Sequence, residues 1–185
     1  MTRTRIKICG LRRKEDISYV NEVLPDFAGF IFDPSRRRYI NPETAAVLRP
    51  QLADSIRAVG VFVNAAPEEI LRIAETVRLD LIQLHGSEDD TYIRNLRKQT
   101  SLPIIKAIRV RTEEDTTHAT ASSADLILLD NGAGGTGTRF NWELAQKVSR
   151  DFLLQEESQR RMPQTPSGCA IHGGSMPVLP WKQRE

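Results

Sequence analysis

The feature that most constrains the fold of this chain is a regular alternation of short apolar runs with amphipathic segments. Six runs rich in Ile, Val, Leu and Phe recur about 24 residues apart. They cover Ile6–Cys9, Phe27–Phe32, Arg57–Val63, Leu81–Leu84, Ile104–Ile108 and Leu126–Leu129. Strands that are buried on both faces have this composition, and helices separate such strands when the sheet is parallel. The sequence therefore predicts an α/β fold of consecutive strand-helix units.

Two of the intervening segments begin with a recognisable helix start. Pro42 follows Asn41, and Pro67 is followed by Glu68 and Glu69. Proline suits the first helical position because its missing N–H would have no partner there, and acidic side chains near the start interact favourably with the helix dipole. Both segments are expected to be helices that lead into the next strand.

Six strand-helix units fit either a doubly wound sheet or most of a (β/α)8 barrel, also called a TIM barrel. The first strand ends in the residues CGLR and lacks the Gly-rich dinucleotide fingerprint, which favours the barrel. From about Gln155 the sequence has four prolines and neither strand alternation nor a helical stripe. We expect an incomplete TIM-barrel domain with about six regular units over residues 1–154, and an irregular, disordered tail over residues 155–185.

The bulk composition narrows the class of protein. The net charge is only +2, and most arginines are scattered, so the sequence gives no sign of nucleic-acid binding. No apolar run reaches the ~18–20 residues of a membrane helix, and the first residues lack the apolar segment of a signal peptide. We therefore expect a cytoplasmic protein without a membrane partner. In that compartment Cys9 and Cys169 are expected to stay reduced, without a disulfide.

The chemistry of a (β/α)8 barrel comes from residues at the C-terminal ends of its strands. Candidates at those positions are Cys9, Asp33 with the cluster Arg36–Arg38, Asn64, His85, Arg109 and Asp130. A cysteine acts as base or nucleophile only as a thiolate, which needs cationic or dipolar neighbours. We expect strand alternation to direct the side chain of Lys7 to the face opposite Cys9. The alternative for Cys9 is a small buried apolar residue.

Asp130 closes an apolar run and precedes the Gly-rich segment 131–138. A carboxyl held among apolar side chains has a raised pKa, as a proton donor at neutral pH requires, and a Gly-rich loop can offer N–H groups to a phosphate. The alternative for Asp130 is a loop or helix cap. His85 is as readily a structural hydrogen-bonding group, and of the arginine cluster we expect one member to face the barrel mouth and bind a carboxylate.

Several motifs together resemble the phosphoribosylanthranilate isomerases of tryptophan biosynthesis. They are KICGL around Cys9, GFIF followed by RRYI, GVFVN at Gly60–Asn64, QLHG at Gln83–Gly86, IKA at Ile105–Ala107 and LLD...GGTGTRFNW within Leu128–Trp142. They occur in the order and spacing of that family, over about Arg5 to Leu154. Each motif alone is only suggestive, whereas the combination is highly specific.

The resemblance implies an Amadori rearrangement, which converts N-(5-phosphoribosyl)anthranilate to 1-(o-carboxyphenylamino)-1-deoxyribulose 5-phosphate without cofactor or metal. An aspartic acid protonates the furanose ring oxygen to open a Schiff base, and a cysteine thiolate removes the C2 proton. These roles fall on Asp130 and Cys9. Substrate binding falls on Arg38, Gln83, His85, Gly134 and Gly135, with Arg38 on the anthranilate side. The protein is expected to be a monomer or homodimer.

The chain departs from the family pattern in two places. Arg36 stands where the family usually has a serine. After Leu154 the chain lacks the family's two phosphate-binding loops in register. Gln155–Ser158 can be encoded by codons that read Ala-Gly-Gly-Ile in another phase, so we interpret the tail as a reading-frame shift. With two strands lost, we expect open strand edges and weak or absent activity.

Two other functions are alternatives to the isomerase. One is an inactive fragment that binds substrate or a neighbouring enzyme of the pathway without turnover. The other is a related phosphate-binding barrel such as indole-glycerol-phosphate synthase, which requires catalytic lysines and a glutamate at strand ends. Lys106 lies inside a predicted strand and no strand-end glutamate is evident, so this rival ranks last.

Overall fold

Seven strands of the chain pair in parallel and in sequence order. The computed structural model describes residues 5–130, 142–155 and 167–170. The seven strands are β1 (Ile6–Cys9), β2 (Phe27–Ile31), β3 (Arg57–Phe62), β4 (Leu81–Leu84), β5 (Ile104–Arg109), β6 (Leu126–Asp130) and β7 (Phe152–Gln155). The helices between them are α1 (Lys14–Val23), α2 (Pro42–Leu48) continued by the 3-10 helix η1 (Arg49–Gln51), α3 (Pro67–Val77), α4 (Asp90–Arg97), α5 (Glu113–Ala121) and α6 (Trp142–Ala145).

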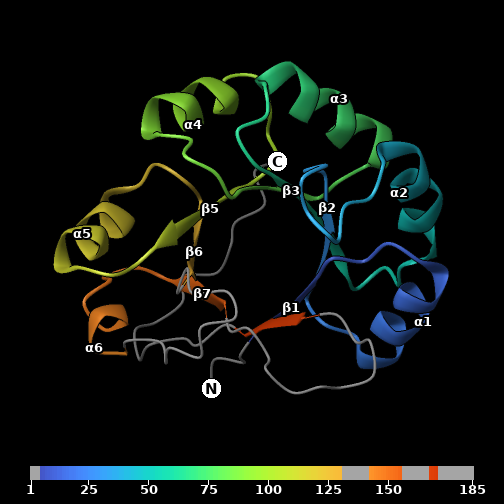
Figure 1. Ribbon diagram of the computed structural model, residues 1–185, viewed down its shortest axis with the longest axis horizontal. Helices are drawn as coiled ribbons and strands as arrows, with labels where there is room; N and C mark the ends of the chain where they lie inside the picture. The colour runs from blue at the N-terminus through green and yellow to red at the C-terminus, as the bar shows by residue number, and fades with distance from the viewer. Residues whose placement is uncertain (1–4, 131–141, 156–166, 171–185) are drawn as a thin grey trace.

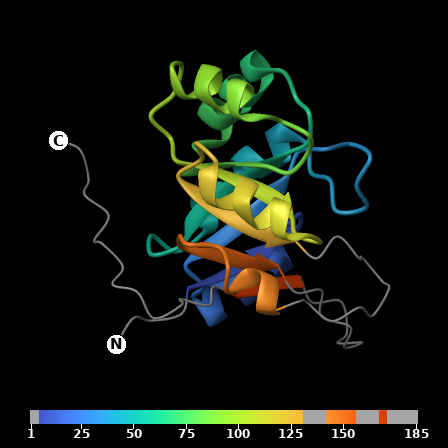
Figure 2. The same ribbon diagram turned by 90° about the vertical axis from the view of Figure 1, so that its left-hand side faces the viewer.

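The helices lie outside the ring of strands, as Figure 1 shows along the barrel and Figure 2 from the side. Each of the strands β1 to β6 is followed by one helix, which gives six βα units. The predicted TIM-barrel fold with about six regular units is therefore confirmed. Strands β1 and β4 have the predicted bounds, and the other four differ by one residue at their C-terminal ends.

The barrel is closed by an eighth strand, β8 (Ser167–Ala170), which pairs antiparallel with both β7 and β1. A regular TIM barrel has eight parallel strands. Here only eleven residues separate Gln155 from Ser167. That is short of the dozen or more that a parallel crossover needs, whereas an antiparallel return needs far fewer.

The expected open strand edges are therefore wrong, because β8 occupies the gap between β1 and β7. Regular structure also occurs inside the range 155–185, which the sequence predicted to be irregular. The remaining residues of that range lie outside the described part of the chain, and the division at residue 154 stays a prediction.

Local signals explain where the helices begin. The side chain of Asn41 accepts a hydrogen bond from the N–H of Thr44 at 2.7 Å, with Pro42 in the first helical position of α2. Asp89 caps α4 in the same way through the N–H of Tyr92, at 2.7 Å. Such caps satisfy N–H groups that the helix cannot, and each contributes about 0.5–2 kcal/mol.

The apolar core has two layers separated by the sheet. The larger layer lies between strands and helices and includes Phe30, Phe62, Ile82 and Leu129. The smaller layer fills the barrel interior with alternate strand residues, namely Phe27, Val59, Leu81, Ile105, Ala107, Leu128 and Leu153. Strand alternation puts residues two positions apart on one face. The inner layer therefore shows which side chains of each strand face the barrel interior.

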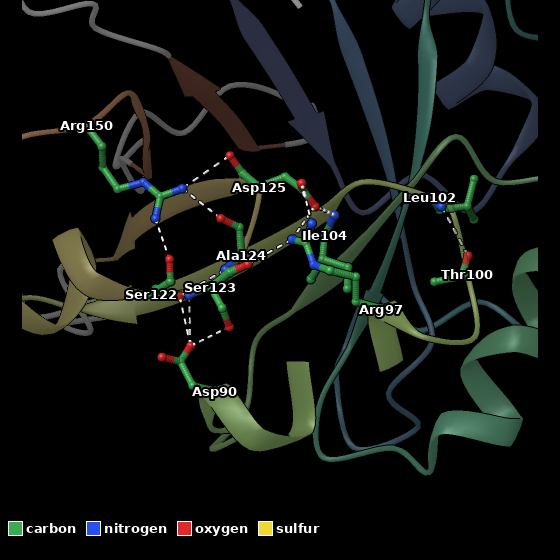
Figure 3. A network of polar contacts seen from close by, with 10 residues as sticks. All are labelled: Asp90, Arg97, Thr100, Leu102, Ile104, Ser122, Ser123, Ala124, Asp125 and Arg150. Atoms are coloured by element: carbon green, nitrogen blue, oxygen red, sulfur yellow. Dashed lines mark hydrogen bonds and ion pairs between the residues drawn. The ribbon is translucent and has the colours of Figure 1, made fainter. Parts of the chain in front are cut away.

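A polar network ties the starts of β5 and β6 to the neighbouring helices (Figure 3). Arg97 of α4 makes a bidentate ion pair with Asp125, whose Oδ2 also accepts from the N–H of Ile104 at 2.8 Å. Arg150 donates to the carbonyl oxygens of Ser122 and Ala124. These bonds fix where both strands begin. They therefore also fix how far along the barrel axis the C-terminal ends of β5 and β6 lie.

Within the described ranges, no helix combines the length and the apolar character that crossing a bilayer demands.

Candidate active site

The C-terminal ends of β1, β2, β4 and β6 bring the candidate residues to one end of the barrel interior. Gly29, Gln83 and Asp130 each follow an inner-layer residue of their own strand by two positions, so they share its inward face. Cys9 pairs in register with Gly29 on the neighbouring strand. Of the predicted strand-end residues, Cys9 and Asp130 are therefore placed at the same end of the barrel, together with Gly29 and Gln83.

The thiol of Cys9 occupies the space that Gly29 leaves empty. Cys9 is a free, partly exposed cysteine. A β-carbon on Gly29 would lie 2.7 Å from the Cys9 Sγ and 3.1 Å from the Lys7 Nζ. Real β-carbons essentially never approach another atom this closely, so a larger residue at position 29 would force the thiol to shift. Cys9 is thus a residue of the barrel mouth and not part of the buried apolar layers.

Lys7 lies on the same face as Cys9, and the expected opposite orientation is wrong. Only Ile8 separates the two residues on β1, and strand alternation returns to the same face after two positions. The Lys7 side chain is almost completely buried, with 1% of the residue exposed. A cationic side chain therefore stands beside the thiol inside the barrel.

Arg38 is the member of the arginine cluster that reaches the mouth. Its Nη1 donates to the backbone carbonyl of Cys9 at 2.7 Å. The guanidinium covers Gly10, whose φ of +92° and lack of a β-carbon allow this approach. Figure 2 shows the loop between β2 and α2, which carries these arginines, standing out from one end of the barrel.

Arg36 and Arg37 are exposed, as expected for two of the three arginines. Arg36 makes an ion pair with Asp33 at 3.1 Å, with 57% of its side chain exposed. Burial would raise the pKa of Asp33, but hydrogen bonds from Ser35 and Arg36 together with the charge of Arg36 lower it. Arg36 therefore belongs to a surface turn, which explains why an arginine is tolerated there in place of serine.

His85 joins the ends of β4 and β6. Its Nε2 lies 3.3 Å from the Asp130 Oδ2, and its Nδ1 lies 2.9 Å from the Gln83 Nε2. About a fifth of each side chain of the His85–Asp130 pair is exposed. Gln83 is 1% exposed and its Oε1, also buried, has no hydrogen-bond partner.

Gln83 was predicted to bind substrate, and its burial leaves almost no surface for that. The described hydrogen bond of its side chain is to the Nδ1 of His85. Gln83 therefore holds the imidazole ring in position. The two ends of the Gln83 amide have opposite hydrogen-bonding character, so its orientation selects which His85 nitrogen carries the proton. The sequence offered one signal for this arrangement, the i, i+2 spacing of Gln83 and His85.

A second polar cluster, which sequence analysis missed, holds the loops after β3 and β4. Lys106 donates to Glu88 at 2.8 Å and to the carbonyl of Gly86 at 2.7 Å, and Glu88 accepts from the N–H groups of Asn64 and Gly86. Burial would raise the pKa of Glu88, but the hydrogen bond and charge of Lys106 and the Asn64 N–H lower it. The cluster also lines a shallow pocket with Ser87, Asp89 and Tyr92.

The position of Lys106 argues against the rival function, an indole-glycerol-phosphate synthase, which requires catalytic lysines. Lys106 follows Ile105 of the inner layer, so it points to the helix side of β5 and not into the barrel. Arg109, the last residue of β5, is exposed.

The predicted phosphate-binding residues Gly134 and Gly135 lie outside the described residues.

Comparison with known proteins identifies the family. The sequence model of N-(5'-phosphoribosyl)anthranilate isomerase matches residues 6–155. An enzyme of that name from Endomicrobium trichonymphae is 42% identical over 154 residues, which are 81% of this chain and 75% of the relative. The crystal structure of phosphoribosyl anthranilate isomerase from Thermotoga maritima superimposes with a TM-score of 0.71 at 36% identity, covering 81% of this chain and 75% of that one.

A further solved phosphoribosyl anthranilate isomerase is in complex with reduced 1-(o-carboxyphenylamino)-1-deoxyribulose 5-phosphate. It is 35% identical, with a TM-score of 0.69, covering 81% of this chain and 74% of that one. The barrel, the strand-end residues and the match over residues 6–155 agree: this chain belongs to the N-(5'-phosphoribosyl)anthranilate isomerase family.

Proposed function

We propose that this chain is a phosphoribosylanthranilate isomerase in which Asp130 is the general acid and Cys9 the general base. Asp130 donates a proton to the furanose oxygen, and the ring C–O bond breaks as the anilino nitrogen forms the Schiff base. The Cys9 thiolate then takes the proton from C2, and the electrons of that C–H bond form the enolamine. The enolamine tautomerises to the aminoketose.

The observation that carries this proposal is the gathering of Cys9, Arg38, His85 and Asp130 at one end of one barrel. The thiol and the carboxyl come from β1 and β6, on different sides of the interior. A sugar ring held between them would meet one group on each side. General acid and base steps typically contribute ~10²–10⁴-fold each.

Substrate binding is assigned to the cationic and hydrogen-bonding groups around this pair. The Arg38 guanidinium, held over Gly10 by the Cys9 carbonyl, keeps further N–H groups for the anthranilate carboxylate. Arg38→Met is expected to raise KM about tenfold or more, since a hydrogen bond to a charged group contributes about 1.5–3 kcal/mol. The exposed neighbour provides the matched control, and Arg37→Met is expected to leave KM unchanged.

Gly134 and Gly135 are proposed to bind the substrate phosphate. We further propose that the enzyme acts in the cytoplasm as a monomer or homodimer. Because the segment after Gln155 contains no recognisable counterpart of the two phosphate loops of the family, weak substrate binding is expected for this polypeptide.

The function is tested by following conversion of N-(5-phosphoribosyl)anthranilate by the purified chain over a wide range of substrate concentration. We expect saturable conversion with a high KM. Binding of reduced product without any conversion would instead support the fragment that binds and does not turn over. Growth of a tryptophan-requiring host that lacks the isomerase provides the second measurement, and slow growth is expected.

A further inference from the structure

Lys7 is an interior side chain of the site region that the proposed reaction does not use. It lies on β1 inside the barrel with 1% of its surface exposed. Burying an ammonium group without an anionic partner is unfavourable by several kcal/mol in proteins, so such groups are normally paired or neutral. The surroundings of the Lys7 Nζ therefore require an explanation.

One candidate anion beside Lys7 is the sulfur of Cys9. The Lys7 Nζ and the Cys9 Sγ lie 3.1 Å and 2.7 Å from the same point, the β-carbon position of Gly29. Because these distances add to 5.8 Å, the two atoms lie no farther apart than that. The glycine keeps this space open for both groups, since any larger residue would separate or displace them.

Other charged groups near β1 do not take the place of the thiolate. Among the described residues no carboxylate forms an ion pair with Lys7, and Glu88 is paired with Lys106. On the two strands beside β1, the residues in register with Lys7 are the apolar Phe27 of β2 and Cys169 of β8. Arg38 is the other cation near Cys9, and its described contact is with the backbone carbonyl.

We propose that the Lys7 ammonium is the counter-ion that holds Cys9 in its thiolate form, which makes Lys7 a positioning residue for the proposed isomerase reaction. The pair forms when the thiol proton moves to the amine of Lys7 or leaves to solvent, and no other reactant is needed. Lys7 is proposed to act on the thiolate and not on the substrate, because only 1% of the residue is exposed. Lys7 therefore raises the fraction of enzyme molecules in which Cys9 is a thiolate and can act as the base.

The test is the pH dependence of Cys9 alkylation by iodoacetamide, because only the thiolate reacts. A Cys169→Ser background leaves Cys9 as the single thiol. Lys7→Met removes the charge while keeping most of the side-chain volume, and it should move the pH of half-maximal reactivity up by about 2 units or more. That is the shift expected for unit charges at such a separation in a medium of effective dielectric constant ~20. Lys14→Met removes an exposed lysine of α1 and should change nothing.

Lys7→Arg restores the positive charge and should return the profile toward that of the parent. An unchanged profile in a folded Lys7→Met protein, judged by its far-ultraviolet circular dichroism, would overturn the proposal. If neither Lys7 variant folds, Cys9→Ser gives the reciprocal measurement in a protein that keeps the lysine. Loss of the thiolate should lower the pH at which the Lys7 ¹⁵Nζ resonance titrates, and an unmoved resonance would contradict the pairing.

Alkylation and resonance titration need no turnover, so they judge the pairing even if the chain shows no isomerase activity. In an active protein a further readout separates a positioning role from a structural one. Lys7→Met should move the acidic limb of the kcat/KM profile to higher pH by the same amount as alkylation and leave KM unchanged. A fall in activity at every pH with an unshifted limb would mean that Lys7 only supports the fold.

Discussion

The Nε2 of His85 lies 3.3 Å from the Oδ2 of Asp130, and this contact joins two strand ends that are 45 residues apart in the sequence. Gln83, buried beneath, holds the other nitrogen of the same ring at 2.9 Å. The imidazole is thus held from both sides, and it in turn holds the carboxyl that we propose as the general acid.

His85→Ala is expected to lower kcat by up to about tenfold, the equivalent of a lost hydrogen bond of ~0.5–1.5 kcal/mol between neutral groups. The carboxyl of Asp130 would lose the neighbour that fixes its orientation. Steady-state kinetics measures the effect. His118→Ala, on the exposed face of α5, is the control and should behave as the parent. Equal kcat values for the two variants would show that the imidazole does not support the acid.

Gly29→Ala tests whether the empty space beside Cys9 is required. The new β-carbon would meet the Cys9 Sγ at 2.7 Å and the Lys7 Nζ at 3.1 Å, so both groups must shift. Overpacking of this kind typically costs about 1–3 kcal/mol of stability. We expect at least a tenfold loss of kcat beyond any loss of folded protein, together with a changed alkylation rate of Cys9, because a base displaced by about 1 Å can cost ~10²-fold in rate.

Ala28→Gly supplies the control for that experiment, since Ala28 is the buried neighbour on the opposite, helix-facing side of β2. It should reduce stability by about 0.5–1 kcal/mol through backbone entropy, more if a cavity remains, and leave the alkylation rate of Cys9 unchanged. If the two variants change the thiol reactivity equally, the effect of Gly29→Ala is not specific to the space beside the sulfur.

Glu88→Gln is expected to destabilise the fold by about 3–5 kcal/mol, because it leaves the buried ammonium of Lys106 without its charged partner. Chemical denaturation measures this loss. The exposed pair of Lys147 and Glu113 provides the comparison, and Glu113→Gln should change stability by less than about 1 kcal/mol. Losses of similar size in the two variants would contradict the structural role of the buried pair.

The same pair predicts a pH dependence of stability. The pKa of Glu88 in the folded protein is lowered below its ordinary value of 4.5. Its contribution is therefore complete above pH ~4.5 and is lost as the pH falls through the folded-state pKa. The free energy of unfolding of the parent should drop more steeply below pH 4.5 than that of Glu88→Gln. Parallel curves would show that Glu88 does not titrate with unfolding.

Local patterns sufficed to predict the first six strands and several residues at the barrel mouth. The runs at Leu81–Leu84 and Ile6–Cys9 are mostly apolar, with one polar residue each, Gln83 and Lys7, so their bounds could be predicted from composition. The positions of Cys9 and Asp130 follow from the rule that strand ends meet at one rim. The orientation of Lys7 was also accessible, since counting two positions along β1 puts it on the face of Cys9.

Other features depend on contacts between distant segments, which a single sequence does not display. The pairing of Lys106 with Glu88 requires the strand and the preceding loop to be placed in space first. The antiparallel β8 has no apolar alternation in Ser167–Ala170, and it forms because two strand edges, β1 and β7, are already present to pair with it. Such an element is stabilised by backbone hydrogen bonds that any short extended segment can supply.

The most direct test of the account is the rate of conversion of N-(5-phosphoribosyl)anthranilate by Cys9→Ala, Asp130→Asn and the double variant, each shown to be folded and to bind reduced product. We predict that each single variant lowers kcat by about 10²–10⁴-fold. The double variant should be slower still or close to the slower single variant. Retention of the parent kcat by either single variant would contradict the assignment of base and acid.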